Sequence, residues 1–223
     1  MQIFADSHAI TLIGADGSVS GMGFHAGANK GNSALTDSAE FRTYRFPDTF
    51  NVADVKKYAI GKFNRYVLMN DGRTYWQGRC KHYVNGIGGC DSCVEFKEHA
   101  ATYFANGDDK TVDIVGGKHF LVSLSESGRI RSTGYMFFRE IQSEFRKQEV
   151  HSEDLPIEIT MPDGFEKAVK LFASMKERIL WANLVKPGGT VKTMKIGECK
   201  PWTEMKLVED SNYLVDIQSC HYH

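Results

Sequence analysis

The sequence predicts an all-β fold, specifically a β-propeller of about four repeats. Three observations predict it: a hairpin pattern that occurs four times, a nearly constant spacing between the copies, and a strand-like pattern upstream of the hairpins. A propeller blade is a small antiparallel sheet whose faces become buried only when neighbouring blades stack against it, and a repeat of this length fits one blade. The alternative is a β-sandwich whose unrelated hairpins imitate a period.

Each hairpin pattern consists of an alternating apolar stretch, a polar turn containing glycine, and a second alternating stretch. The four copies read HAITLIGADGSVSGMG, RYVLMNDGRTYWQG, HFLVSLSESGRIRSTG and RILWANLVKPGGTVKTMK. Their turn glycines are Gly17, Gly72, Gly128 and Gly189, spaced by 55, 56 and 61 residues. Glycine supplies the positive φ that a tight hairpin turn requires, and the alternation predicts strands with a buried face.

A further strand is expected before each hairpin. The segments that carry it are VDIVGGKH at 112–119, VDIQSCHYH at 215–223 and, more loosely, MQIFADSH at 1–8 and VKKYAIGKFNRY at 55–66. His8 and His119 occupy the same place in this pattern, so we expect them to form structural hydrogen bonds rather than to bind metal.

We therefore expect a single propeller-type domain over residues 1–223. Its repeats run over approximately 1–50, 51–108, 109–160 and 161–214, and a further copy starts at 215–223. Three arrangements fit this count: a partial ring that belongs to a longer propeller, a closed four-bladed ring, or half of a ring that a second copy of the chain completes. Ring closure matters because an open blade leaves an unpaired edge.

The composition is that of a folded globular protein without a dominant charge. Lys and Arg total 27 against 28 Asp and Glu, a net charge of −1, so charge does not indicate nucleic acid as a partner. The apolar stretches are far shorter than the roughly 20 residues that span a bilayer, and the amino terminus does not resemble a secretory signal. We expect a cytoplasmic or nuclear protein that is not inserted in a membrane.

The third copy is similar to a known repeat. Its pattern V-D-I-x-x-G-x-x-H-x-x-x-L-x-x-x-G-x-I-x-x-x-G is carried by Val112, Asp113, Ile114, Gly117, His119, Leu124, Gly128, Ile130 and Gly134, and it resembles the regulator of chromosome condensation repeat. The resemblance covers most of the chain in degenerate copies. It implies a propeller, typically of seven blades, whose members exchange nucleotide on small GTPases, dock on chromatin or act as modules in ubiquitin ligases and scaffolds.

On this basis the predicted function is that of a non-catalytic protein-interaction or scaffold module. The first alternative is a guanine-nucleotide exchange factor for a small GTPase. The third is a propeller-fold enzyme or a metal-binding protein, although the sequence contains neither G-x-S-x-G nor HExxH. No catalytic residue is assigned.

One cluster has the chemistry of metal ligands. Cys80, His82, Cys90 and Cys93 surround a glycine-rich loop and could hold a tetrahedral zinc ion, although the spacing is shorter than in common zinc fingers. The alternative is a loop between blades with free thiols. Zinc is therefore the only cofactor that the sequence suggests.

The segment from residue 138 to 156 is the candidate site for a protein partner. Phe138, Ile141 and Phe145 fall at helical spacing beside Arg146, which predicts a short amphipathic helix inserted in the scaffold. The alternative is a solvated loop whose phenylalanines pack on the adjacent blade.

Overall fold

The computed structural model describes most of the repeat framework. The described residues are 2–5, 9–16, 18–28, 35–45, 50–61, 64–79, 92–99, 104, 108–117, 120–134, 156–173, 179–197 and 200–205. They form four antiparallel sheets of four strands each, and each sheet is assembled in chain order. The predicted fold class, an all-β propeller of about four repeats, is confirmed.

The sheets are blades 1 to 4. Blade 1 contains β1 (Gln2–Ala5), β2 (Ala9–Ile13), β3 (Ser18–Ala28) and β4 (Leu35–Arg45). The 3-10 turn η1 (Val52–Asp54), capped by Asn51, leads into blade 2, which contains β5 (Val55–Ile60), β6 (Asn64–Met69), β7 (Thr74–Arg79) and β8 (Ser92–Glu98).

Blades 3 and 4 repeat this plan. Blade 3 contains β9 (Thr111–Gly116), β10 (Phe120–Ser125), β11 (Ile130–Gly134) and β12 (Ile157–Ile159). Blade 4 contains β13 (Lys167–Ala173), β14 (Ile179–Val185), β15 (Val191–Gly197) and β16 (Lys200–Glu204). The repeated hairpins of the sequence are the second and third strands of each blade.

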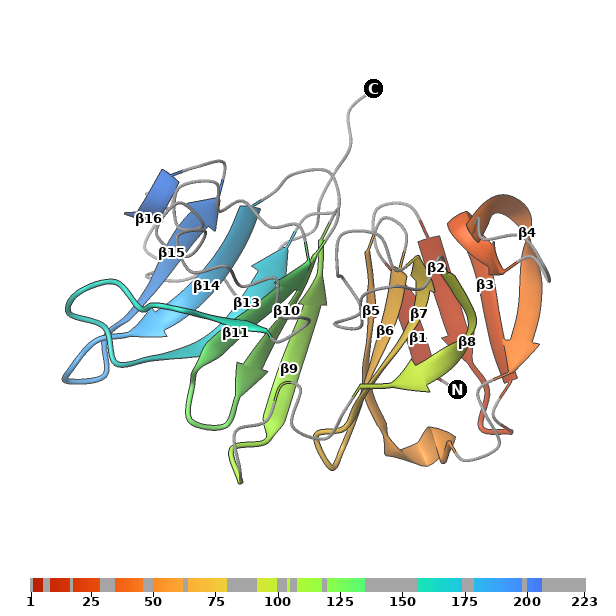
Figure 1. The fold of residues 1–223 in the computed structure, drawn as a ribbon, viewed down its shortest axis with the longest axis horizontal. Coiled ribbons are helices and arrows are strands. Elements are labelled where there is room, and N and C mark those ends of the chain that lie inside the picture. Colours follow the sequence, from red (N-terminus) through yellow and green to blue (C-terminus); the bar gives the residue numbers. More distant parts are fainter. Residues whose placement is uncertain are drawn as a thin grey trace.

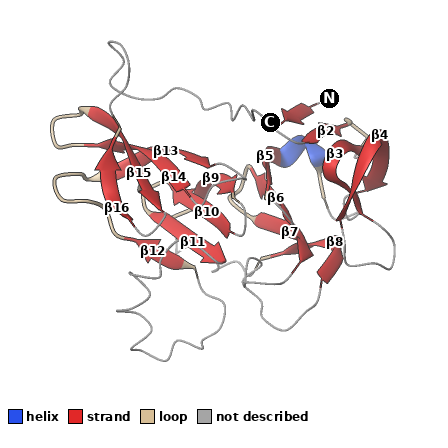
Figure 2. Ribbon diagram, turned by 90° about the horizontal axis from the view of Figure 1, so that it is seen from above, coloured by secondary structure: helices blue, strands red, loops and turns tan. Residues whose placement is uncertain are grey.

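The blades follow one another in chain order along an arc, with blade 1 and blade 4 at opposite ends (Figure 1). The view turned by 90° shows the same succession (Figure 2). First strands of neighbouring blades contact each other, β5 with β9 and β9 with β13, so they form the inner side of the arc. The single chain is thus a partial propeller and not a closed four-bladed ring.

Each junction between blades has its own hydrophobic core. We call the side of a blade that faces the following blade its forward face, and the opposite side its rear face. At the junction of blades 1 and 2 the core contains Ile13, Val19, Val55, Tyr58, Val67, Met69, Tyr75 and Phe96. At the junction of blades 2 and 3 it contains Ala59, Tyr66, Leu68, Trp76, Phe104, Ile114 and Leu121.

The junction of blades 3 and 4 is the largest of these cores. It contains Val115, Phe120, Val122, Leu124, Ile130 and Ile159 from blade 3, and Ala168, Leu171, Leu180, Ala182, Leu184, Met194 and Ile196 from blade 4. All six residues of β6 and all six of β10 are buried, because these strands have a blade on both sides. In the terminal blade, four residues of β14 are buried, and the other three, Ile179, Trp181 and Val185, are half-buried.

Within the described part of the chain, no helix is both long and apolar enough to cross a membrane.

Candidate functional site

The turns between second and third strands have the same geometry in blades 2, 3 and 4. The N–H groups of Gly72, Gly128 and Gly189 donate to the carbonyls three residues earlier, at 3.0, 2.9 and 2.9 Å. The three glycines have φ values of 91°, 86° and 87°, in the left-handed region that glycine adopts without steric cost. Glycine therefore recurs at this position of the turns because the backbone there has a positive φ.

Two of these glycines also touch the next blade. A Cβ built on Gly72 would lie 3.2 Å from the Cβ of Lys110, and one on Gly128 would lie 2.4 Å from the Cβ of Lys167. The amide of Ala168 donates to the carbonyl of Gly128 at 3.0 Å, which joins blades 3 and 4 directly. A Cβ on Gly189 would meet nothing within 4 Å. The turn glycine is crowded where a blade follows it and open in blade 4.

Each turn is also tied to the segment that leads into the first strand of its own blade. The amide of Asn70 donates to the carbonyl of Asp54 at 2.8 Å, and the amide of Glu126 donates to the carbonyl of Lys110 at 2.9 Å. We use the name turn face for this side of blades 2 to 4, made of residues 51–54, 70–73, 108–110, 126–129, 162–166 and 186–190. Because turns and leading segments share backbone hydrogen bonds, the turn face is built on a fixed framework.

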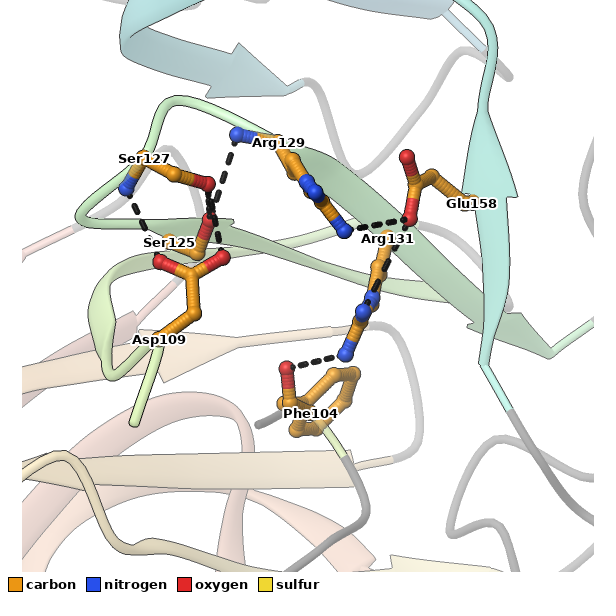
Figure 3. Close-up of polar contacts among 7 residues, drawn as sticks. All are labelled: Phe104, Asp109, Ser125, Ser127, Arg129, Arg131 and Glu158. Carbon is orange, nitrogen blue, oxygen red and sulfur yellow. Dashed lines mark hydrogen bonds and ion pairs between the residues drawn. The ribbon is translucent and has the colours of Figure 1, made fainter. Parts of the chain in front are cut away.

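The turn of blade 3 is held by one carboxylate. Asp109 accepts hydrogen bonds from the N–H of Ser127 at 2.9 Å and from its hydroxyl at 2.6 Å (Figure 3). The hydroxyl of Ser125 accepts from the N–H of Arg129 at 3.1 Å. Partial burial opposes ionisation of Asp109, but the hydrogen bonds from Ser127 and Ser125 and the charge of Arg129 outweigh it, so its pKa is lowered.

Two arginines of β11 and its turn converge on a carboxylate of β12. The Arg129 and Arg131 guanidinium groups lie 3.9 and 3.6 Å from the Glu158 carboxylate, and Arg131 also donates to the carbonyl of Phe104 at 2.8 Å (Figure 3). The Arg129 side chain is half-exposed, whereas that of Arg131 is largely covered. Arg131 therefore anchors the linker between blades, and Arg129 presents its charge to solvent.

Blade 2 has a corresponding group of polar side chains. Asp71 accepts from the N–H of Arg73 at 2.9 Å and from its Nε at 2.6 Å, Arg73 donates to the Tyr75 hydroxyl at 3.0 Å, and Tyr75 donates to Glu98 at 3.0 Å. Burial opposes ionisation of Asp71, but the hydrogen bonds from Arg73 outweigh it and lower the pKa of Asp71. Arg73, like Arg129, keeps about half of its side chain exposed.

A pair between third and fourth strands recurs in blades 2, 3 and 4. It joins Tyr75 to Glu98, Arg131 to Glu158, and Lys192 to Glu204, the last at 3.2 Å. The first member always stands three residues after the turn glycine, and in blades 2 and 3 the two residues are register partners. Sequence reasoning did not find this pair, although the constant offset of its first member was a usable signal.

Sequence reasoning also did not find His99, which is fully buried beside the junction of blades 2 and 3. Its Nδ1 lies 3.0 Å from the Thr74 hydroxyl, and its amide donates to the Thr74 carbonyl at 2.9 Å. Burial lowers the pKa of the imidazole to about 3. His99 is therefore neutral at physiological pH and belongs to the core.

Most of the predicted site residues lie outside the described residues. This holds for the partner-site residues Phe138, Ile141, Phe145 and Arg146, for the ligand candidates Cys80, His82 and Cys90, and for Gly17, His8 and His119. Cys93 is in β8, paired in register with Gly78. Among the described side chains no group of three or more His, Cys, Asp or Glu could hold a metal ion. The zinc site and the inserted helix therefore remain predictions.

No known protein family matches the chain by sequence profile, and no curated protein matches it by sequence. Solved structures do match. Human WBSCR16 has a TM-score of 0.60 at 14% identity over 88% of this chain and 46% of its own. Yeast RCC1 (Prp20) bound to Kap60 has a TM-score of 0.56 at 17% identity over 87% of this chain and 43% of its own.

A second Prp20p structure, from Saccharomyces cerevisiae, was described together with its binding properties to Gsp1p and histones. It has a TM-score of 0.56 at 17% identity over 89% of this chain and 45% of its own. The chain thus spans less than half the length of the solved propellers it matches. At these identities the similarity establishes the fold, a propeller like that of RCC1.

Proposed function

We propose that the chain is a non-catalytic module that binds protein partners through the turn face of its blades. The observation that carries this proposal is the construction of that face from turns and leading segments locked to one another, with Arg73 and Arg129 half-exposed upon it. Charged groups held in place before binding lose little conformational entropy when a partner binds, and they favour electrostatically complementary surfaces.

The chemistry of the described polar groups also favours binding over catalysis. The carboxylate oxygens of Asp71 and Asp109 accept hydrogen bonds that hold the turns of blades 2 and 3. These hydrogen bonds lower the pKa of each carboxyl group. A general acid or base at neutral pH needs a pKa near the working pH, which is the opposite direction for a carboxylate. These carboxylates are suited to shaping the surface that a partner meets.

The test is quantitative capture of partners with matched variants. Arg73→Ala combined with Arg129→Ala removes both half-exposed cations, whereas Lys195→Ala removes an exposed cation from β15 outside the turn face. We expect the double variant to lose a defined set of captured proteins that the control retains. Equal capture by the double variant, shown by circular dichroism to be folded, would overturn the assignment of the turn face.

The insertion at 138–156 is the second surface in this proposal. Changing Phe138, Ile141 and Phe145 together to Ser removes its apolar positions, while Arg146 keeps its charge. If the insertion holds the partner, this variant loses capture while the turn-face variant keeps it. The two variants therefore assign the partner to one surface, or show that both contribute.

The alternative function is nucleotide exchange on a small GTPase, which the resemblance of the repeat implies. The structural similarity to Prp20p, a protein described with its binding properties to Gsp1p, favours this alternative function. Accelerated release of labelled nucleotide from one member of a GTPase panel would support exchange. Unchanged nucleotide release across the panel would count against exchange and leave the non-catalytic binding module as the proposed function.

Two further predictions belong to the same proposal. Zinc at Cys80, His82, Cys90 and Cys93 is tested by metal analysis of the purified chain, and less than about a tenth of an equivalent would exclude it. The expected cytoplasmic or nuclear location is tested by imaging a tagged chain in cells.

A further inference from the structure

The chain contains three Asp-Gly pairs, and the aspartates are held differently. The pairs are Asp16-Gly17, Asp71-Gly72 and Asp163-Gly164. Such a pair can rearrange without an enzyme, because glycine has no side chain that would keep its amide nitrogen from the carboxyl carbon of the aspartate before it. The rearrangement requires a carboxyl group that is able to turn toward the amide of the glycine.

In the first two pairs the carboxylate is bound elsewhere. Asp16 accepts hydrogen bonds from the N–H of Ser18 at 3.1 Å and from its hydroxyl at 2.6 Å. Asp71 accepts from the N–H of Arg73 at 2.9 Å and from its Nε at 2.6 Å. In both cases the bonded amide stands two residues after the aspartate. The carboxylate is therefore committed to that amide and not to the amide of the glycine.

The second pair has two further restraints. The Gly72 N–H donates to the Met69 carbonyl at 3.0 Å, and a Cβ built on Gly72 would lie 3.2 Å from the Cβ of Lys110. Burial opposes ionisation of Asp71, but the hydrogen bonds from Arg73 outweigh it, so the pKa of Asp71 is lowered. Since water leaves only from a protonated carboxyl group, the lowered pKa makes the reactive form scarcer.

The pair Asp163-Gly164 has none of these restraints. Both residues are exposed in the segment that leads into β13. Among the described residues, the Asp163 carboxylate has no hydrogen bond or ion pair, and the Gly164 N–H has no acceptor. Gly164 has a φ of 78°, and a Cβ built on it would meet nothing within 4 Å. The carboxyl group can therefore approach the amide nitrogen without first breaking a hydrogen bond.

We propose that Asp163 is a site of spontaneous isomerisation, where the folded chain converts aspartate to isoaspartate. The Gly164 nitrogen attacks Cγ of the protonated Asp163 side chain; a C–N bond forms, and the carboxyl hydroxyl and the amide proton leave together as water. The resulting succinimide then takes up a water molecule. Addition at the original main-chain carbonyl breaks its bond to the Gly164 nitrogen and gives isoaspartate, whereas addition at Cγ restores aspartate. Water is the only other reactant.

Isoaspartate at this position lengthens the main chain by a methylene group inside a short turn. The turn is closed by the Phe165 N–H, which donates to the Pro162 carbonyl at 3.2 Å. The Phe165 ring centroid lies 5.1 Å from Nζ of Lys186, which belongs to the hairpin turn of blade 4. The rearrangement therefore alters the turn face where the leading segment of blade 4 meets its hairpin turn. The inference does not depend on which partner the turn face holds.

The test is to incubate the purified, folded chain for several weeks at mildly acidic pH, where part of the carboxyl groups is protonated. Peptide mapping with electron-transfer fragmentation then distinguishes isoaspartate from aspartate of the same mass. We expect isoaspartate to form at Asp163 at least about tenfold faster than at Asp71. That ratio corresponds to about 1.4 kcal/mol in the barrier, a difference that a hydrogen bond to a charged group can supply.

An unfolded sample separates the effect of the fold from that of the local sequence. In guanidinium chloride the contacts of Asp71 are lost while both Asp-Gly pairs remain, so the two sites should isomerise at similar rates. Equal rates at Asp163 and Asp71 in the folded chain would overturn the proposal. So would a ratio that unfolding leaves unchanged, or a folded chain that forms no isoaspartate at Asp163 while the unfolded chain does.

A pair of matched variants identifies the reacting side chain. Asp163→Glu should abolish isomerisation at this position, because the longer side chain would have to close a larger ring. Asp108→Glu makes the same change at another exposed carboxylate, which no glycine follows, and should leave the rate at Asp163 unchanged. An equal loss of isomerisation at position 163 in both variants would contradict the assignment to the Asp163 carboxyl group.

Discussion

The junction of blades 2 and 3 and the junction of blades 3 and 4 are both hydrophobic cores between neighbouring blades, but they are made of different residues. The first combines Tyr66, Trp76 and Phe104 with buried His99 beside them. The second is made mostly of Val, Leu, Ile and Ala side chains. The second strands β6 and β10, which have a blade on both sides, are completely buried, so burial requires neighbouring blades but not a particular chemistry. From this difference we predict that only the first junction makes the free energy of unfolding depend on pH.

The largest expected effect is a cavity in the aliphatic junction. Leu180→Ala removes a side chain that is 0% exposed and should lower the free energy of unfolding by about 3 kcal/mol. Leu121→Ala, at an equally buried position in the other junction, is the matched control and should cost about the same at pH 7. Urea unfolding measures both, and a gap above about 2 kcal/mol would show that the junctions contribute unequally.

The next effect isolates contact between blades from backbone strain. Ala at either Gly128 or Gly189 must adopt a positive φ, which costs roughly 1–2 kcal/mol. Only at Gly128 would the new methyl also meet the next blade, at 2.4 Å from the Cβ of Lys167 and 2.9 Å from the Ala168 carbonyl. We expect Gly128→Ala to be the more destabilising by at least about 1 kcal/mol. Equal losses in thermal unfolding would mean that blade 4 moves freely to accommodate the methyl.

The third effect is the pH response of the junction of blades 2 and 3. Burial lowers the pKa of His99 from 6.5 to about 3, so the unfolded chain binds a proton at pH values where the folded chain does not. The stability from this group is full above pH 6.5 and is lost as the pH falls from about 6.5 toward 3, by at most roughly 1.4 kcal/mol per pH unit.

His99→Asn tests this effect without adding a titrating group. Its unfolding free energy should change less between pH 7 and 5 than that of the wild type, by about 2 kcal/mol. Asp109, whose pKa is lowered, loses its contribution only as the pH falls below 3.8, outside this window. A variant with the full wild-type pH dependence would place the titration elsewhere.

The sequence predicted the parts of the fold that depend on neighbouring residues in the chain. The repeated turns at Gly72 and Gly128 were visible because glycine is required there, and the strand expected at 112–119 is β9 (Thr111–Gly116). The strand pairs of Glu98, Glu158 and Glu204 were not visible, because these residues stand 26, 30 and 15 residues after their turn glycines.

His99 escaped sequence analysis for a related reason. Nothing near it in the sequence distinguishes it from a surface histidine, and it is buried where its ring packs beside those of Phe104 and Trp76. Variable connections between third and fourth strands and contacts between blades are long-range properties, which a periodic pattern does not encode. The predicted insertion residues Phe138 and Phe145 lie outside the described residues and stay predictions.

The smallest expected effect concerns the ion pair that joins blades 2 and 3 at their first strands. Lys57 lies 2.5 Å from Asp113, with side chains 35% and 19% exposed. Solvent screens a pair of this exposure, so a double-mutant cycle with Lys57→Met and Asp113→Asn should give a coupling of about 0.5–1 kcal/mol that weakens in 1 M salt. The aliphatic junction has no counterpart among the ion pairs of the described residues, so Leu180→Ala should cost the same at both salt concentrations. If salt changed the Lys57–Asp113 coupling and the cost of Leu180→Ala equally, the chemical difference between the two junctions would have no energetic consequence at neutral pH.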